Sequence, residues 1–129
     1  MSNLDTPVRR QFVYDLRSMP KKNVLGDLST SHGASFTGER IYVALITKAR
    51  GTGSTKPHRH PDETFNYVLQ GSLKVNMDGQ DFLVPQGSLL HIPQNMPHTS
   101  IATEDSDAVV LIWRDATSEK AGLPTTIES

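Results

Sequence analysis

Two histidines, His58 and His60, stand one residue apart in the stretch GTGSTKPHRHPDETFNYVLQG, which runs from residue 51 to residue 71. A β-strand turns every second side chain toward the same face, so this spacing can aim both imidazoles at one point. A third histidine, His98, follows Pro97 much later in the chain, and an all-β barrel can bring such distant strands face to face. Three neutral imidazoles suit Zn, Fe, Ni, Cu or Mn and leave positions open for water or substrate. These three histidines are therefore the candidate metal ligands.

The histidine pair also has an ordinary interpretation. A His-x-His pair can be the solvated end of a loop with no ligand role, and a single exposed histidine is usually only a surface residue. The neighbouring prolines favour the metal hypothesis, because Pro57 holds the residue before it extended and Pro61 bends the chain before Phe65.

The composition describes a single soluble domain. A chain of 129 residues is long enough for one hydrophobic core and too short for two. The formal net charge is -1 and no run of basic residues is longer than Lys21-Lys22, so we expect no nucleic-acid partner. The sequence shows neither an apolar signal region nor a run long enough to span a bilayer, which predicts no membrane partner and a cytoplasmic location. Cysteine is absent, so any metal must use nitrogen or oxygen ligands.

Short segments rich in strand-forming residues alternate with turn residues along most of the chain. Strands are expected at residues 11–16, 40–47, 65–70, 73–77, 80–84, 88–92, 98–102 and 108–114. Asp78-Gly79 is the strongest hairpin signal. Residues 19–40 are expected to be loop with one short strand at most, and residues 115–129 a tail or one short turn packed on the outside. No stretch has a helical period, so the pattern indicates an all-β sandwich or barrel.

Two patterns of glycine, proline and histidine surround the candidate ligands. The first is formed by Gly53, His58, His60 and Gly71, and the second by Gly87, Pro93 and His98. Both resemble the two motifs of the cupins, small double-stranded β-helix proteins of the jelly-roll type. The resemblance implies a single cupin domain with its barrel at about residues 40–114, an N-terminal strand and loop at residues 8–39, and a tail at residues 115–129. It also implies a divalent transition metal, Fe, Mn, Ni or Zn, but it names no reaction because this fold hosts many unrelated functions.

One position departs from the family's pattern. Counting back from Gly71, the place that is usually a Glu ligand is occupied by Thr64, and a carboxylate sits one residue earlier, at Glu63. Either the turn after Pro61 is irregular enough for Glu63 to reach inward as a fourth ligand, or the metal has three histidines and the Thr64 hydroxyl holds a bound water. The intact register to Gly71 favours three histidines, because strand neighbours face opposite sides. Asp62 and Glu63 are then solvated turn residues.

Other side chains could line a pocket beside such a site or simply belong to the core. They are Tyr42, Phe65, Tyr67 and Trp113 on expected strands, and Met96 near His98. His91 is either a partner of the site on a neighbouring strand or an ordinary histidine satisfied by the backbone. His32 is expected in a surface loop. Arg40 would favour an anionic substrate if it pointed inward, but it also fits a solvated strand end.

Three hypotheses about function stay open. The first is a metal-dependent enzyme acting on a small oxygenated organic molecule, with three-histidine dioxygenase-like chemistry or a non-redox lyase or isomerase reaction. Glu63 or Tyr67 could serve as its base, although no motif fixes a catalytic residue. The second is a non-catalytic small-molecule-binding or regulatory module, and the third is a cupin that has lost its metal. The exposed edge of the expected strand at residues 11–16 predicts a homodimer.

Overall fold

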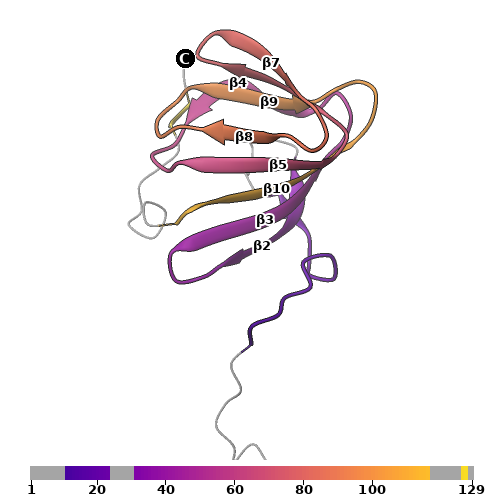
Figure 1. Cartoon of the computed structure of the whole chain (residues 1–129), viewed down its shortest axis with the longest axis vertical. Coiled ribbons are helices and arrows are strands. Elements are labelled where there is room, and N and C mark those ends of the chain that lie inside the picture. The colour runs from indigo at the N-terminus through magenta and orange to yellow at the C-terminus, as the bar shows by residue number, and fades with distance from the viewer. Residues whose placement is uncertain (1–10, 24–30, 117–125, 128–129) are drawn as a thin grey trace, which may run out of the picture.

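Figure 1 shows the computed structural model of the chain, which describes residues 11–23, 31–116 and 126–127. These residues form strands, turns and loops, and no helix in the described part of the chain could serve as a membrane span. The strands are β1 (Lys22–Asn23), β2 (His32–Thr37), β3 (Ile41–Lys48), β4 (Gly53–Arg59), β5 (Thr64–Gln70), β6 (Leu73–Met77), β7 (Gln80–Val84), β8 (Leu89–Ile92), β9 (His98–Ala102), β10 (Ala108–Asp115) and β11 (Thr126–Ile127).

The strands form two antiparallel sheets. One has the order β1-β2-β3-β10-β5-β8, and the other has the order β11-β4-β9-β6-β7. Strands far apart in sequence are neighbours, as β3 and β10 are in the first sheet and β4 and β9 in the second (Figure 1). This arrangement is an all-β jelly roll, or double-stranded β-helix, and it confirms the expected fold class.

The hydrophobic core lies between the two sheets. Alternate residues of each strand point inward, as the strand period requires, so one cluster draws on both sheets. It comprises Ala44, Ile46, Val68, Leu73, Val75, Val84, Leu90, Ile92, Ala102, Ala108 and Val110. The inward positions that continue this pattern at one end of the core are polar: Lys48 on β3, Thr64 and Asn66 on β5, and Ser100 on β9. That polar end is where the candidate ligands lie.

Most of the expected strands are confirmed. Those at residues 73–77, 80–84 and 98–102 have the bounds that the sequence predicted, and the strands at residues 40–47, 65–70, 88–92 and 108–114 differ by one residue at one or both ends. The Asp78-Gly79 hairpin is also present, with φ of 51° at Asp78 and 80° at Gly79. Positive φ at both positions is what a two-residue type I′ turn requires.

The strand expected at residues 11–16 is wrong, because these residues form a loop that enters a turn. The carboxylate of Asp15 closes this turn by accepting hydrogen bonds from the Arg17 amide at 3.1 Å and the Ser18 hydroxyl at 2.6 Å. The hydroxyl of Tyr14 donates to the backbone carbonyl of Gln11 at 3.1 Å. An Asp side chain that bonds to its own local backbone competes with sheet formation, and this explains the difference.

Four described strands lie where the sequence indicated mostly loop or a tail. β1 and β2 both lie in residues 19–40, where one short strand at most was expected, and His32 is the exposed first residue of β2. β4 was missed because its sequence GSTKPHR lacks apolar alternation. β11 lies in the expected tail and pairs with β4 at Arg59 and His58. Pairing with neighbouring strands, rather than intrinsic strand propensity, accounts for these elements.

Candidate metal centre

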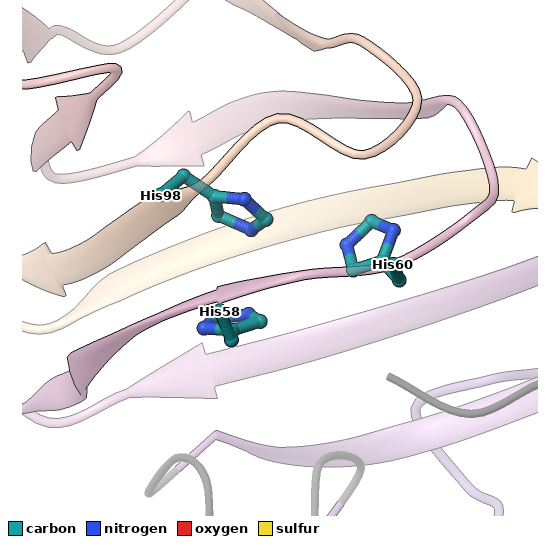
Figure 2. Close-up of side chains that lie close together, drawn as sticks. All are labelled: His58, His60 and His98. Carbon is teal, nitrogen blue, oxygen red and sulfur yellow. The ribbon is translucent and has the colours of Figure 1, made fainter. Parts of the chain in front are cut away.

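The three histidines meet at the polar end of the core. His58 lies on β4, His60 follows the end of that strand, and His98 begins the neighbouring strand β9 directly opposite His58. One ligand nitrogen from each ring lies within 4.8 Å of the others, and the side chains converge from the two segments (Figure 2). The ring centroids of His58 and His98 are 4.3 Å apart, and those of His60 and His98 are 5.2 Å apart. The side chains of this group could hold a metal ion.

Each histidine ring is oriented by the backbone. Nδ1 donates to a carbonyl two residues away in every case: from His58 to Lys56 at 3.2 Å, from His60 to Asp62 at 3.0 Å, and from His98 to Met96 at 2.8 Å. Because a carbonyl oxygen only accepts, Nδ1 carries the proton and the lone pair of a neutral ring is on Nε2. This pattern, with one nitrogen fixed by the protein and the other available, is typical of metal-binding histidines.

The surroundings also keep the three rings neutral. Burial lowers the pKa of His58 and of His60 below the usual value, and it lowers the pKa of His98 to about 4. The positive charge of Lys48 lowers the pKa of His58 and His98 further. Metal ions bind the neutral form of imidazole, so these shifts favour coordination at neutral pH. The donor set therefore fits a transition metal.

Thr64 and Glu63 occupy opposite faces of the sheet. Thr64 faces the histidines with 4% of its surface exposed, and its hydroxyl has no hydrogen-bond partner among the described residues. Glu63 points away, where its carboxylate accepts a hydrogen bond from Nε2 of His91 at 2.7 Å. Both side chains of that pair are about half exposed, at 51% and 48%. The inward position beside the three histidines thus belongs to a hydroxyl and not to a carboxylate.

Asp62 is not the solvated turn residue that we expected. Only 4% of it is exposed, and its Oδ2 accepts a hydrogen bond from Nη1 of Arg114 at 3.1 Å. The Arg114 guanidinium lies 4.6 Å from the centre of the Tyr42 ring. Because the Asp62 carbonyl also holds His60, one residue connects this ion pair to the histidine cluster.

A cavity of about 80 Å³ opens beside the histidines. Its apolar wall includes Tyr42, Ile46, Ile92 and Ile112. Its polar lining includes Lys48, Ser54, Thr64, Asn66, Ser100 and Arg114. Three buried polar atoms have no hydrogen-bond partner among the described residues: Thr64 Oγ1, Asn66 Oδ1 and Ser100 Oγ. Buried polar groups are normally satisfied, so this lining is arranged for water or a ligand.

Lys48 is the main residue that we did not predict from the sequence. It is 4% exposed, and its ammonium donates to the Ser100 carbonyl at 3.0 Å. Burial lowers the pKa of Lys48 to about 8. The signal was present in the strand period, because Lys48 stands on the same face as Ala44 and Ile46, two core residues.

The expected pocket residues divide between the two faces. Tyr42 lines the cavity, whereas Phe65 and Trp113 stack on the outer face of the sheet with ring centroids 5.7 Å apart. Tyr67 shares that outer face, since it lies two residues from Phe65 on β5. Our prediction for these three aromatics is corrected, because the inward positions of β5 are those of Thr64, Asn66 and Val68.

The remaining predicted residues lie around the site without entering it. Met96 packs against the core and contributes its carbonyl to His98. His91 stacks on Phe65 at 5.1 Å and is therefore a surface residue bonded to Glu63, not a partner of the histidine cluster. Arg40 borders a hollow on the outer face, together with Phe65 and Trp113.

The sequence and the fold both match known cupins. Residues 44–114 match the family model described as Cupin domain. No curated protein matches the sequence. Among solved structures, the polyketide cyclase RemF from Streptomyces resistomycificus is similar, with 18% identity, a TM-score of 0.78, and 93% of this chain and 87% of that chain covered.

Two further solved structures are similar in the same way. KdgF from Halomonas sp. is 19% identical with a TM-score of 0.67, and 81% of this chain and 94% of that chain are covered. A cupin protein from Bacteroides fragilis is 25% identical with a TM-score of 0.55, and 64% of this chain and 70% of that chain are covered. The similarity to RemF and KdgF extends to the fold alone.

Proposed function

This chain belongs to the cupin domain family, and on that premise we propose that it is a metal-dependent enzyme acting on a small oxygenated organic molecule. The observation that carries the proposal is the orientation of His58, His60 and His98. Each ring donates from Nδ1 to a backbone carbonyl and keeps Nε2 for a ligand, and the three converge beside one cavity. A histidine group with a purely structural role has no need of three fixed tautomers beside an open space.

A divalent Fe, Mn, Ni or Zn ion held by these histidines would supply Lewis-acid chemistry at the oxygen atoms of a ligand, and iron would add redox chemistry. The chain's own residues position that ligand. Tyr42, Ile46 and Ile112 form an apolar wall, while the hydroxyls of Thr64 and Ser100 can donate hydrogen bonds to it. The cavity volume of about 80 Å³ favours compact molecules. Glu63 and Tyr67 point to the outer face and are no longer candidates for the base.

Two reaction classes are compatible with this site. One is dioxygenase-like chemistry at a three-histidine metal, and the other is a non-redox lyase or isomerase reaction through a stabilised enolate. The alternative to both is a non-catalytic module that binds a small molecule. The hydroxyl at Thr64 in place of a carboxylate supports the three-histidine interpretation, because it leaves the cluster without an acidic ligand.

Turnover by the metal-loaded protein tests the proposal. The protein would be loaded separately with Fe(II), Mn(II), Ni(II) and Zn(II) and incubated with β-diketones, 2-hydroxy acids and 2-oxo acids. NMR would follow substrate loss, and an oxygen electrode would follow oxygen uptake. We expect turnover that is lost in His98→Gln. Binding of these compounds without turnover under every metal would contradict the enzyme proposal and favour the non-catalytic module.

We also propose that the chain forms a homodimer. The predicted strand at residues 11–16 no longer supports this, but the outer face of the first sheet does. Tyr67 and Leu89 lie opposite each other on β5 and β8 and are 36% and 54% exposed, and Leu69 is 41% exposed. A contiguous apolar patch of this kind is typical of an interaction surface. Cytoplasmic residence and the absence of nucleic-acid and membrane partners stay predictions from the sequence.

A further inference from the structure

We propose that Lys48 binds the carboxylate of the ligand, and that this site therefore takes compact organic acids with a second oxygen that can reach the metal. The inference rests on the proposed function and narrows its substrate class. Its basis is the placement of one buried ammonium group, the charges around it, and the unsatisfied polar atoms that share its cavity.

The position of Lys48 is a core position. It is the last residue of β3, on the face that also carries Ala44 and Ile46, and it lines the same cavity as the three histidines. Its ammonium is held by the carbonyl of Ser100, which lies two residues after His98 on β9. An ammonium at such a site is costly to bury, so an apolar residue would be the more stable choice. Packing alone therefore does not account for a lysine here.

The charges of the cavity do not balance. Among the described residues, no carboxylate forms an ion pair with Lys48. The buried acid Asp62 already pairs with Arg114, and Glu63 lies on the outer face with His91. The three histidines are neutral, so the cavity carries one net positive charge, that of Lys48. A divalent metal would add two more. Because Thr64 supplies no negative charge either, we infer that the ligand supplies it.

The donors around Lys48 suit a carboxylate. An ammonium has three N–H donors, and the Ser100 carbonyl takes one of those of Lys48. The hydroxyls of Thr64 and Ser100 lack partners among the described residues and can donate as well. A carboxylate accepts several hydrogen bonds through its two oxygens, so it can satisfy these groups together. The cavity of about 80 Å³ suits a compact molecule.

Glycolate and its uncharged amide, glycolamide, form a matched pair of probes, because each offers two oxygens to a metal and only glycolate carries a charge. Their affinities for the Zn(II)-loaded full chain would be measured by titration calorimetry. We expect Lys48→Met to weaken glycolate binding about tenfold or more, since a hydrogen bond to a charged group is lost. Glycolamide binding should change less than about twofold. Lys74→Met removes an exposed lysine from β6 and serves as the control that leaves both affinities unchanged.

A second measurement uses the wild-type fold and does not depend on the stability of Lys48→Met. The ¹⁵N resonance of the Lys48 ammonium, assigned by its absence in Lys48→Arg, should shift when glycolate is added to the Zn(II)-loaded protein and stay in place with glycolamide. Equal glycolate affinity in wild type and Lys48→Met, or an unmoved Lys48 resonance at saturating glycolate, would overturn the inference while leaving the metal site intact. Failure of the wild type to take up zinc would instead overturn the proposed function on which the inference rests.

Discussion

Each histidine of the cluster is a neutral ring with a fixed proton position. The hydrogen bonds from Nδ1 to the backbone set the tautomer, and burial is the largest cause of the lowered pKa values. A free histidine would spend part of its time protonated near pH 6.5, and a protonated ring cannot bind a metal. The fold therefore holds the three rings in the form that a metal ion would bind.

This preparation predicts an acid-dependent loss of stability in the metal-free protein. Burial lowers the pKa of His98 to about 4, against about 6.5 in the unfolded chain. Well above pH 6.5 the ring is neutral in both states, so its titration does not change the free energy of unfolding. As the pH falls from 6.5 toward 4, the unfolded state gains a proton that the folded state does not, and stability falls by up to about 3 kcal/mol. Urea unfolding at pH 7, 5.5 and 4 measures this change.

The matched control for this prediction is His98→Gln, which cannot titrate in this range. Its free energy of unfolding should fall less steeply between pH 6.5 and 4 than that of the wild type. Identical pH profiles for the two proteins would contradict the assignment of His98 as a buried neutral ring.

The sequence predicted the histidines but not the charged residues around them. His58, His60 and His98 were predictable because their spacing and the flanking prolines are typical of ligands that converge from two strands. Lys48 was not predictable in the same way, since a lysine at the end of a strand is ordinarily solvated. Its burial depends on β9 of the other sheet, whose Ser100 carbonyl accepts its hydrogen bond only in the folded chain. Asp62 was misjudged for the same reason, because its partner Arg114 is distant in sequence and reaches it only in the folded chain.

At the scale of elements, the pairing of β4 with β9 holds the site together. Gly53 begins β4 with φ of 151°, opposite Ile101. A Cβ at this residue would lie 2.2 Å from the Ser100 carbonyl oxygen, which is the oxygen that accepts from Lys48. Backbone fills the space that any side chain at Gly53 would need. Glycine is therefore required for the close approach of the two strands that carry His58 and His98.

Gly53→Ala should for this reason destabilise the fold and disrupt the candidate metal site. We expect a loss of at least about 3 kcal/mol in the free energy of unfolding, since the strained φ and the backbone clash add together. Zinc affinity should fall as well. Urea unfolding and a zinc titration give the two values.

Gly79→Ala provides the comparison for that variant. Gly79 has φ of 80°, but a Cβ there would meet nothing within 4 Å, so only backbone strain of about 1–2 kcal/mol is expected and zinc binding should be unchanged. A cost for Gly53→Ala no larger than that for Gly79→Ala would contradict the role given to the β4 and β9 pairing.

Strand prediction succeeded where side chains alternate or clear turns bound the segment, and failed where pairing alone makes the strand. The apolar residues of β6 follow the two-residue period, whereas β7 and β9 have the predicted bounds because turn residues flank them. β4 carries His58 in a polar sequence, and β11 is only two residues long. Such elements exist because a neighbouring strand offers hydrogen bonds, which a single sequence does not display.

At the scale of the whole molecule, the two sheets place different chemistry on their two sides. The inner side holds the core and the histidine cluster, whereas the outer side of the first sheet carries an apolar patch at Tyr67, Leu69 and Leu89. The jelly roll thus keeps the candidate active site separate from the proposed dimer surface. A substitution in the dimer surface should leave metal binding at the candidate active site unchanged.

Leu89→Glu tests this separation. Leu89 is 54% exposed and lies opposite Tyr67, so a charge there should weaken the dimer without disturbing the core. Sedimentation velocity should show a dimer for the wild type and a monomer for the variant, with the same zinc content per chain in both. Lys74→Glu, an exposed change on the other sheet, should remain dimeric. A monomeric wild type at micromolar concentration would contradict the dimer proposal.

The measurement that tests the central claim most directly is the metal content of the untagged full chain, purified without added metal or chelator. Elemental analysis would compare the wild type with the triple variant His58→Ala, His60→Ala, His98→Ala. We predict about one transition-metal ion per wild-type chain and less than about a tenth of that in the variant, because the nitrogens of these three histidines form the single proposed site. Equal metal in the two proteins would show that these histidines do not hold the ion.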